Sequence, residues 1–128
     1  MIGLCRDLGL DIVQPEQWTL AEQARMFRQA DLVVGVKGAS LANALFCSSR
    51  THLVVLTPGD FPDPFYWDLI APAGIGYSEI FGVLQSRDRP TGHNAFTVSI
   101  AGLRESWRPV SRTSRLPCLD LPDRYSSV

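Results

Sequence analysis

A lysine, two small residues and a serine follow an apolar run in the stretch VVGVKGASLANALF, residues 33–46. Lys37 supplies a flexible positive charge, Gly38 allows close approach of a backbone, and Ser40 can cap a helix or donate a hydroxyl. A helix that begins here points amides with partial positive charge out of the fold, which suits a phosphate. The candidate anion-binding residues are Lys37, Gly38, Ala39, Ser40 and Asn43. The alternative is a plain structural turn that leaves Lys37 in solvent.

The loop matches neither of the common nucleotide-binding fingerprints. The dinucleotide pattern GxGxxG needs a third glycine, whereas only Gly35 and Gly38 are present. The next strand ends on Val55 and Leu56, with no acidic residue to hold a ribose. The GxxxxGK[ST] pattern is also absent. An unrelated Rossmann-like dinucleotide binder is therefore disfavoured.

The remaining polar groups point to no metal site and no catalytic centre. Asp60 and Asp63 bracket a Phe-Pro pair and lack the tight DxD spacing of metal-dependent sugar transferases, so we expect them to form a turn. The three cysteines are widely spaced and form no CxxC pair and no metal-ligand pattern with either histidine. We expect no metal and no cofactor, and we assign no catalytic residue.

Apolar periodicity places these groups on alternating strands and helices. Thr19 and Glu22 have the spacing of a capping box, which predicts a helix with one face on a core, formed by Leu20, Ala24, Phe27 and Ala30. Strands are expected at 10–13, 32–36, 52–57, 77–84 and 95–100, and helical segments at 2–8, 20–30, 39–46, 65–70 and 103–107. We predict an α/β fold with a Rossmann-like open, mostly parallel sheet flanked by helices over residues 1–108, followed by an irregular tail at 109–128.

Composition limits the kinds of partner. The chain has 128 residues, a formal net charge of −1, 45% apolar residues and 20% charged residues. This balance is ordinary for a globular chain and gives no electrostatic reason to expect nucleic acid or an anionic membrane as partner. No apolar run approaches the roughly 20 residues that a membrane-spanning helix needs. We therefore expect a cytoplasmic protein without a transmembrane segment.

The order of features in residues 13–46 resembles the C-terminal half of glycosyltransferase family 61, which includes capsular-polysaccharide-biosynthesis-type enzymes. The family pattern runs from a "pE" segment through a helix beginning "sl.eQ" and a strand "vvG" to "HGAgLtN..F". The matching residues are Pro15-Glu16, Leu20 to Gln23, Phe27, Ala30, Val33 to Gly35, Gly38-Ala39, Leu41, Asn43 and Phe46. The resemblance extends over residues 8–108 and is looser in its second half.

Three departures from the family pattern concern the chemistry of the loop. Lys37 stands where the family has histidine, Ser40 replaces its second glycine, and Val55 takes the place of a glutamate in the next strand. Lysine can neutralise a diphosphate but does not offer the protonation switch of imidazole. The chain also lacks the family's N-terminal half, and catalysis in a cleft between two domains needs both walls.

The resemblance implies that the chain is the nucleotide-sugar-binding half of a two-domain glycosyltransferase. Such an enzyme transfers a sugar from a nucleotide-diphosphate donor to a saccharide acceptor in polysaccharide biosynthesis. The expected partners are the donor, the acceptor and either the missing N-terminal half or a second copy of the chain. The alternative is a degenerate, non-catalytic module that binds a nucleotide or a partner through the same loop.

Overall fold

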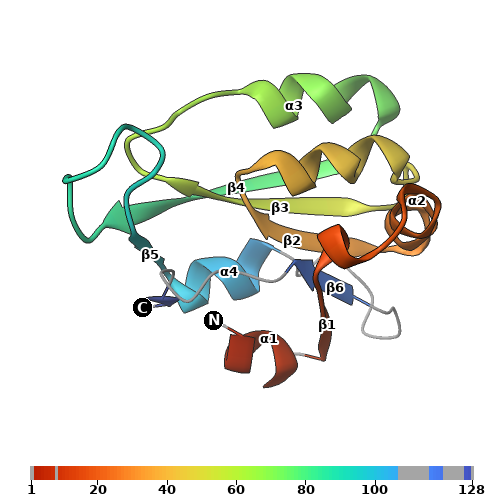
Figure 1. The fold of residues 1–128 in the computed structure, drawn as a ribbon, viewed down its shortest axis with the longest axis horizontal. Coiled ribbons are helices and arrows are strands. Elements are labelled where there is room, and N and C mark those ends of the chain that lie inside the picture. Colours follow the sequence, from red (N-terminus) through yellow and green to blue (C-terminus); the bar gives the residue numbers. More distant parts are fainter. Residues whose placement is uncertain (1, 8, 107–115, 120–125, 128) are drawn as a thin grey trace.

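A computed structural model describes residues 2–7, 9–106, 116–119 and 126–127 (Figure 1). The α-helices are α1 Ile2–Asp7, α2 Leu20–Gln29, α3 Phe65–Ile70 and α4 Ile100–Ser106. Three 3₁₀ helices are η1 Pro15–Gln17, η2 Ala39–Phe46 and η3 Ala71–Ala73. The strands are β1 Leu10–Val13, β2 Leu32–Val36, β3 His52–Pro58, β4 Gly76–Leu84, β5 Phe96–Val98, β6 Leu116–Leu119 and β7 Ser126–Ser127. None of the described helices is long and apolar enough to cross a membrane.

The strands form one mixed sheet in the order β1-β6-β2-β3-β4-β5-β7. All neighbours from β1 to β4 pair in parallel, β5 is antiparallel to β4, and β7 is parallel to β5. The three strands β2, β3 and β4 therefore end at one edge of the sheet. Loops that leave this edge commonly hold ligands in α/β folds.

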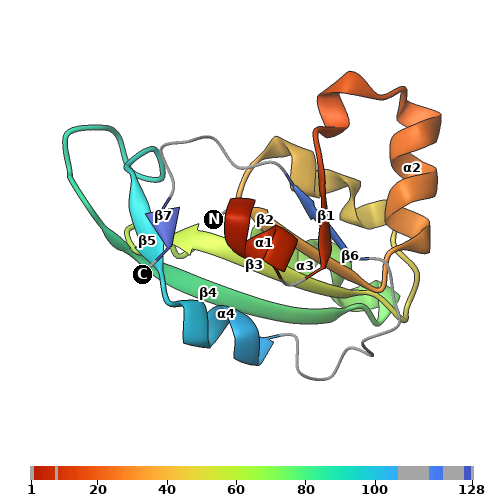
Figure 2. The same ribbon diagram turned by 90° about the horizontal axis from the view of Figure 1, so that it is seen from below.

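Helices cover both faces of the sheet, so the chain is a mixed α/β protein. Figure 1 shows η2 and α3 above the strands with α2 at one side, and α1 and α4 below. In Figure 2, seen from below, α1 lies in front of the strands and α4 lies beside β4. Alternate residues of β2 serve the two cores: Val33 packs in the cluster with Phe27 and Tyr66, whereas Leu32 packs in the cluster with Leu10 and Leu103. This burial on both faces confirms the expected central strand.

A capping box in the sequence determines where α2 begins. Thr19 and Glu22 form the predicted capping box, with Thr19 N–H donating to Glu22 Oε2 at 2.7 Å and Glu22 N–H donating to Thr19 Oγ1 at 3.2 Å. The bond from the Thr19 amide is the main reason that the Glu22 pKa lies below its usual value. Phe27 and Ala30 are buried as expected. Leu20 is 66% exposed, so its assignment to the core is wrong. Leu20 is the first residue of α2, and the buried residue of this helix is Phe27, two turns later.

Three elements differ from the sequence prediction. Residues 39–46 form a 3₁₀ helix, in which Leu41 N–H bonds Gly38 O, because the Ala-Leu pattern does not distinguish i+3 from i+4 bonding. Ile100 begins α4 and does not end a strand. The segment 109–128, expected to be irregular, contains β6 and β7. The sequence does not predict β6, because Pro117 lacks the amide donor that a residue in a central strand normally supplies. The domain boundary at residue 108 stays a prediction.

Candidate functional site

The loop after β2 leaves the sheet at the edge where parallel strands end. Lys37 N–H still bonds Leu56 O on β3 at 2.9 Å, and η2 begins two residues later. Gly38 is exposed, with an extended φ of 175°, so its backbone conformation is open to any residue. The first hydrogen bond of η2 comes from the Leu41 amide. Within the described residues, the amides of Ala39 and Ser40 therefore have no partner, as at the start of any helix.

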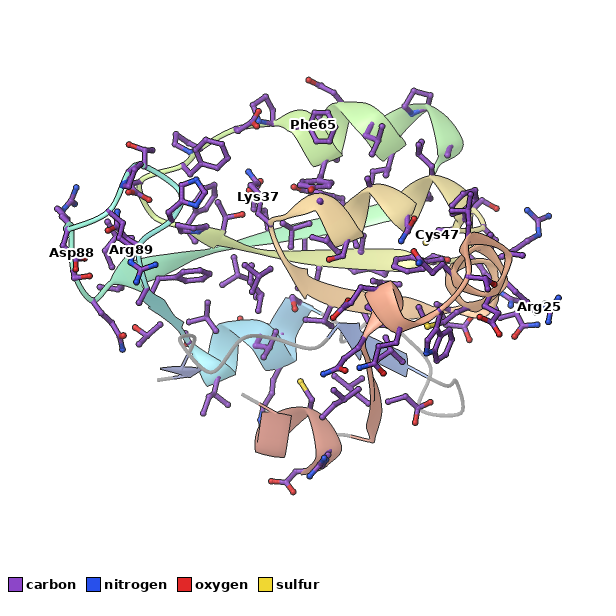
Figure 3. The ribbon with its side chains drawn as sticks, viewed as in Figure 1. Arg25, Lys37, Cys47, Phe65, Asp88 and Arg89 are labelled. Atoms are coloured by element: carbon purple, nitrogen blue, oxygen red, sulfur yellow. The ribbon has the colours of Figure 1, made fainter. Side chains whose placement is uncertain are left out.

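The Lys37 side chain does not extend into solvent. Its side chain is only 5% exposed, and Nζ lies 3.0 Å from Glu79 Oε1 on β4. The same ammonium group donates to the carbonyl oxygens of Asp63 and Phe61, the latter at 3.5 Å, and lies 5.4 Å from the centroid of the Phe61 ring. All three ammonium donors are thus in use. The turn interpretation with a solvated Lys37 is wrong, whereas binding of an anion by Lys37 stays a prediction. Figure 3 shows Lys37 at the beginning of η2, below the loop that leads to α3.

Glu79 is the hub of a polar cluster on the face of the sheet covered by η2 and α3. Besides Lys37, its Oε1 accepts a hydrogen bond from Thr57 Oγ1 at 2.6 Å, and its Oε2 accepts one from the Tyr77 hydroxyl at 3.1 Å. Burial and then the charge of Glu79 raise the Tyr77 pKa well above its usual value, so that hydroxyl stays a donor. Glu79 pairs in register with Val55, the residue that the resemblance described above aligns with a glutamate of the family. A carboxylate is therefore present one strand away from the place where the sequence pattern expects it.

Tyr66 on α3 fixes the other side of the loop. Its hydroxyl donates to Gly38 O, and its ring meets Phe65 edge-on with centroids 5.1 Å apart. Burial is the largest effect on the Tyr66 pKa and raises it, partly offset by the bond to Gly38. The Gly38 carbonyl oxygen is therefore bonded to the protein, whereas Gly38 itself is exposed at the surface. Addition of a Cβ there would meet only Val36 O, at 3.7 Å.

The predicted site residues fall into two groups. Gly38, Ala39 and Ser40 lie together at the start of η2, with Lys37 buried behind them. Asn43 lies apart from this loop in its bonding, because its Nδ2 donates to Gln23 Oε1 on α2 at 2.6 Å. Asn43 therefore joins η2 to α2 in this structure. The assignment of the five residues to a donor site remains a prediction.

The two aspartates after β3 serve the turn, as expected from the sequence. Asp63 Oδ1 accepts from the Phe65 amide at 3.1 Å, and Asp60 Oδ2 accepts from Asn94 Nδ2 at 3.1 Å. These bonds order the loop whose carbonyls hold Lys37. In the part of the chain that the structure describes, no group of three or more His, Cys, Asp or Glu side chains could hold a metal ion.

Sequence reasoning missed Glu79, Thr57 and the two tyrosines as members of one cluster. A signal did exist, because Glu79 is the single charge in the strand GYSEIFGVL, and Thr57 is a polar residue that follows the apolar run Leu53 to Leu56 of β3. Both side chains stand on the same face as Val55, through the alternation of β3 and the register with β4. The register itself is not written in either strand, so the contact with Lys37 could not be deduced.

Comparison with known proteins gives a family and no individual relative. Residues 1–54 match the family described as Glycosyltransferase 61. No curated protein and no solved structure matches the chain. The family match begins before α1 and ends within β3, so it includes the whole loop from Lys37 to Asn43. The match supports membership of this chain in glycosyltransferase family 61 and its classification as glycosyltransferase-like.

Proposed function

We propose that this chain is the nucleotide-sugar-binding half of a glycosyltransferase of family 61, with a Rossmann-like fold. The reaction is transfer of a sugar from a nucleotide-diphosphate donor to a saccharide acceptor in polysaccharide biosynthesis of the capsular type. The family match supports a transferase that uses a sugar donor and an acceptor. The second wall of the cleft comes from an N-terminal half or from a second copy of the chain.

The observation that carries this proposal is the pair of unbonded amides at the start of η2, on the edge where the parallel strands end. The amides of Ala39 and Ser40 precede the first helical hydrogen bond, and Gly38 and Ala39 are exposed. The donor diphosphate binds to these amides and to the Ser40 hydroxyl, which makes no hydrogen bond to the described residues. Stabilisation of the leaving diphosphate by fixed donors of this kind lowers the barrier to transfer.

Lys37 supplies positive charge to this site from behind the loop. Its contact with Phe61 O, at 3.5 Å, is the longest of its three polar contacts. In the proposed complex a phosphate oxygen replaces this carbonyl, while Glu79 holds the ammonium group in place. Asn43 contributes by tying η2 to α2 through Gln23.

A second candidate function is a degenerate module that binds a nucleotide or a partner and does not catalyse transfer. The observation that favours it is the ion pair itself. Lys37 stands at the family's histidine position and is engaged with Glu79 at 3.0 Å, so the site has no imidazole to move a proton. The two functions differ in turnover and share the binding loop.

Calorimetric titration with UDP-sugars and GDP-sugars tests the shared site. Gly38→Ala is the sharpest variant, because the added methyl group meets nothing closer than 3.7 Å inside the protein yet occupies the surface where the diphosphate binds. Gly3→Ala is the matched control, since its methyl group also enters open space. We expect Gly38→Ala to abolish binding, Ser40→Ala to weaken it about tenfold, and Gly3→Ala to leave it unchanged.

Equal binding of a donor by the wild type and Gly38→Ala would remove the assigned site. Sugar transfer to an oligosaccharide acceptor, measured with the N-terminal half of a family 61 enzyme added, separates the two functions. Transfer supports the transferase, and donor binding without transfer supports the non-catalytic module.

A further inference from the structure

A groove of about 480 Å³ runs between β1 and α2, away from the polar cluster around Glu79. Val13 and Met26, which pack against the core, give it an apolar floor. Trp18 stands at one end, between η1 and α2, and is 39% exposed. Asp11 and Gln29 offer polar groups along the walls and make no hydrogen bond or ion pair to other described residues. The groove therefore combines an aromatic surface with unused polar side chains.

A second cavity of about 450 Å³ continues from the first along α2. The two share Arg25 and Gln29, and the second adds Arg28, Arg50, Ser48 and Ser49. Figure 3 shows Arg25 pointing outward from α2, on the side of the molecule opposite Lys37. Together the cavities form one track along α2, hereafter the α2 track, that leads from Trp18 to Arg50.

The two ends of the α2 track differ in charge. Three arginines, Arg25, Arg28 and Arg50, line the far end, and Arg50 forms an ion pair with Asp31 at 3.1 Å. Ser48 lines the same end, and its hydroxyl oxygen is buried without a hydrogen-bond partner among the described residues. Buried polar atoms without a partner are exceptions in folded proteins, and an ordered water or ion is one way in which such an atom is satisfied.

The Trp18 end of the α2 track has an aromatic side chain on which a sugar ring can stack. The Trp18 carbonyl accepts from Gln23 Nε2 at 3.0 Å, which fixes the backbone that carries the indole. Glu22 also lines this end, and its Oε2 accepts the Thr19 amide in the capping box. An amphipathic indole offers an apolar face to the C–H groups of a sugar ring, while Asp11 accepts hydrogen bonds from its hydroxyls.

The α2 track also has a fixed position relative to the proposed donor loop. Trp18 follows the end of β1 and Lys37 follows the end of β2, and β1, β6 and β2 are parallel, so both lie at the same edge of the sheet. The bond between Asn43 and Gln23 links η2 to α2. A chain bound along the track would therefore present its Trp18 end toward the donor side.

We infer that the α2 track binds the acceptor, and that this acceptor is an acidic saccharide chain whose sugar rings carry carboxylates. This inference rests on the proposed function, which supplies the need for an acceptor. A ring stacks on Trp18 at the donor side, and carboxylates of following rings bind Arg25, Arg28 and Arg50. Planar guanidinium groups match carboxylates with two parallel hydrogen bonds.

The test is calorimetric titration of the 128-residue chain with hexameric oligogalacturonate, with maltohexaose as the neutral comparison and inorganic phosphate as the simple oxyanion. The variants are Trp18→Ala and Arg28→Ala, and the control is Arg87→Ala, an exposed arginine in the loop after β4. We expect oligogalacturonate to bind at least tenfold more tightly than maltohexaose or phosphate. Each groove variant should weaken it about tenfold, whereas the control leaves it unchanged. Thermal unfolding confirms that each variant is folded.

Binding that is equal for the acidic and neutral hexamers would overturn the assignment of the acceptor as acidic. Binding that survives both Trp18→Ala and Arg28→Ala would overturn the site. If phosphate binds as tightly as oligogalacturonate, the arginines form a general anion site, and the assignment of a saccharide ligand is refuted. Titration of Gly38→Ala with both ligands separates the two proposals, because this variant should lose UDP-sugar binding and keep oligogalacturonate binding. A wild-type chain that binds oligogalacturonate but binds no UDP-sugar would refute the donor site and leave the α2 track standing.

Discussion

Neutralisation of one partner of the Lys37–Glu79 ion pair should destabilise the fold strongly. The two side chains are 5% and 16% exposed and lie 3.0 Å apart. Coulomb's law at this separation, with an effective dielectric constant of about 20, gives an attraction of about 5.5 kcal/mol. Desolvation offsets much of this energy when the pair forms, but removal of a single partner leaves the other charge buried alone. We expect Glu79→Gln to lower the free energy of unfolding by about 3 kcal/mol.

A double-mutant cycle isolates the interaction itself. Lys37→Met removes the charge and keeps an unbranched side chain, and Glu79→Gln keeps an oxygen for the Thr57 hydroxyl. The double variant should be about 2 kcal/mol more stable than the sum of the two single changes predicts, because neither charge is then left unpaired. The measurement is urea unfolding followed by circular dichroism, at one pH and one ionic strength.

The exposed pair Arg50–Asp31 supplies a matched control within the same chain. Its N–O distance is 3.1 Å, nearly the same, but the side chains are 64% and 27% exposed. The cycle of Arg50→Gln and Asp31→Asn should give a coupling energy of no more than about 0.5 kcal/mol, since water screens both charges. Coupling energies of the two cycles that agree within error would refute the reasoning, because burial would then have no effect on the pair.

Three further perturbations follow from local geometry. Gly82→Ala should destabilise the fold by about 1–3 kcal/mol, because its Cβ would lie 2.0 Å from the buried Phe96 ring. Gly102→Ala in α4, where the new Cβ meets nothing closer than 3.6 Å, should stabilise the fold by about 0.5–1 kcal/mol. Denaturant midpoints that move in the same direction for both variants would contradict this prediction. Burial raises the Cys47 pKa to about 11, so iodoacetamide at pH 8 should modify this site only through unfolding, and peptide mass spectrometry that finds rapid native-state labelling would count against it. Burial lowers the His52 pKa, so the unfolded chain binds the proton more tightly than the folded chain does. The free energy of unfolding should therefore rise with pH between the folded pKa of His52 and about 6.5. Urea titrations at pH 5.5 and 7.5 should show this rise in the wild type and a smaller rise in His52→Gln.

The elements of this fold were largely predictable, because each has a local cause. The apolar run of β2 and the capping box of α2 gave their positions within a residue or two. The Lys37 environment was not predictable, since it depends on how β4 aligns with β3 and on the path of the loop at Phe61. Neither depends on a short-range pattern. The candidate loop was thus located from the sequence, whereas the carboxylate behind it required the tertiary structure.

The sheet order has a consequence for the time course of folding. In the described part of the chain, β1 pairs with β6, so Leu10 finds its partner at Leu116, more than a hundred residues later. In the sheet β6 lies between β1 and β2, and during synthesis β6 is made long after both of them. Contacts of such long sequence separation slow folding, because a large loop must close before they form. β1 therefore cannot complete its pairing until residues 116–119 have been synthesised.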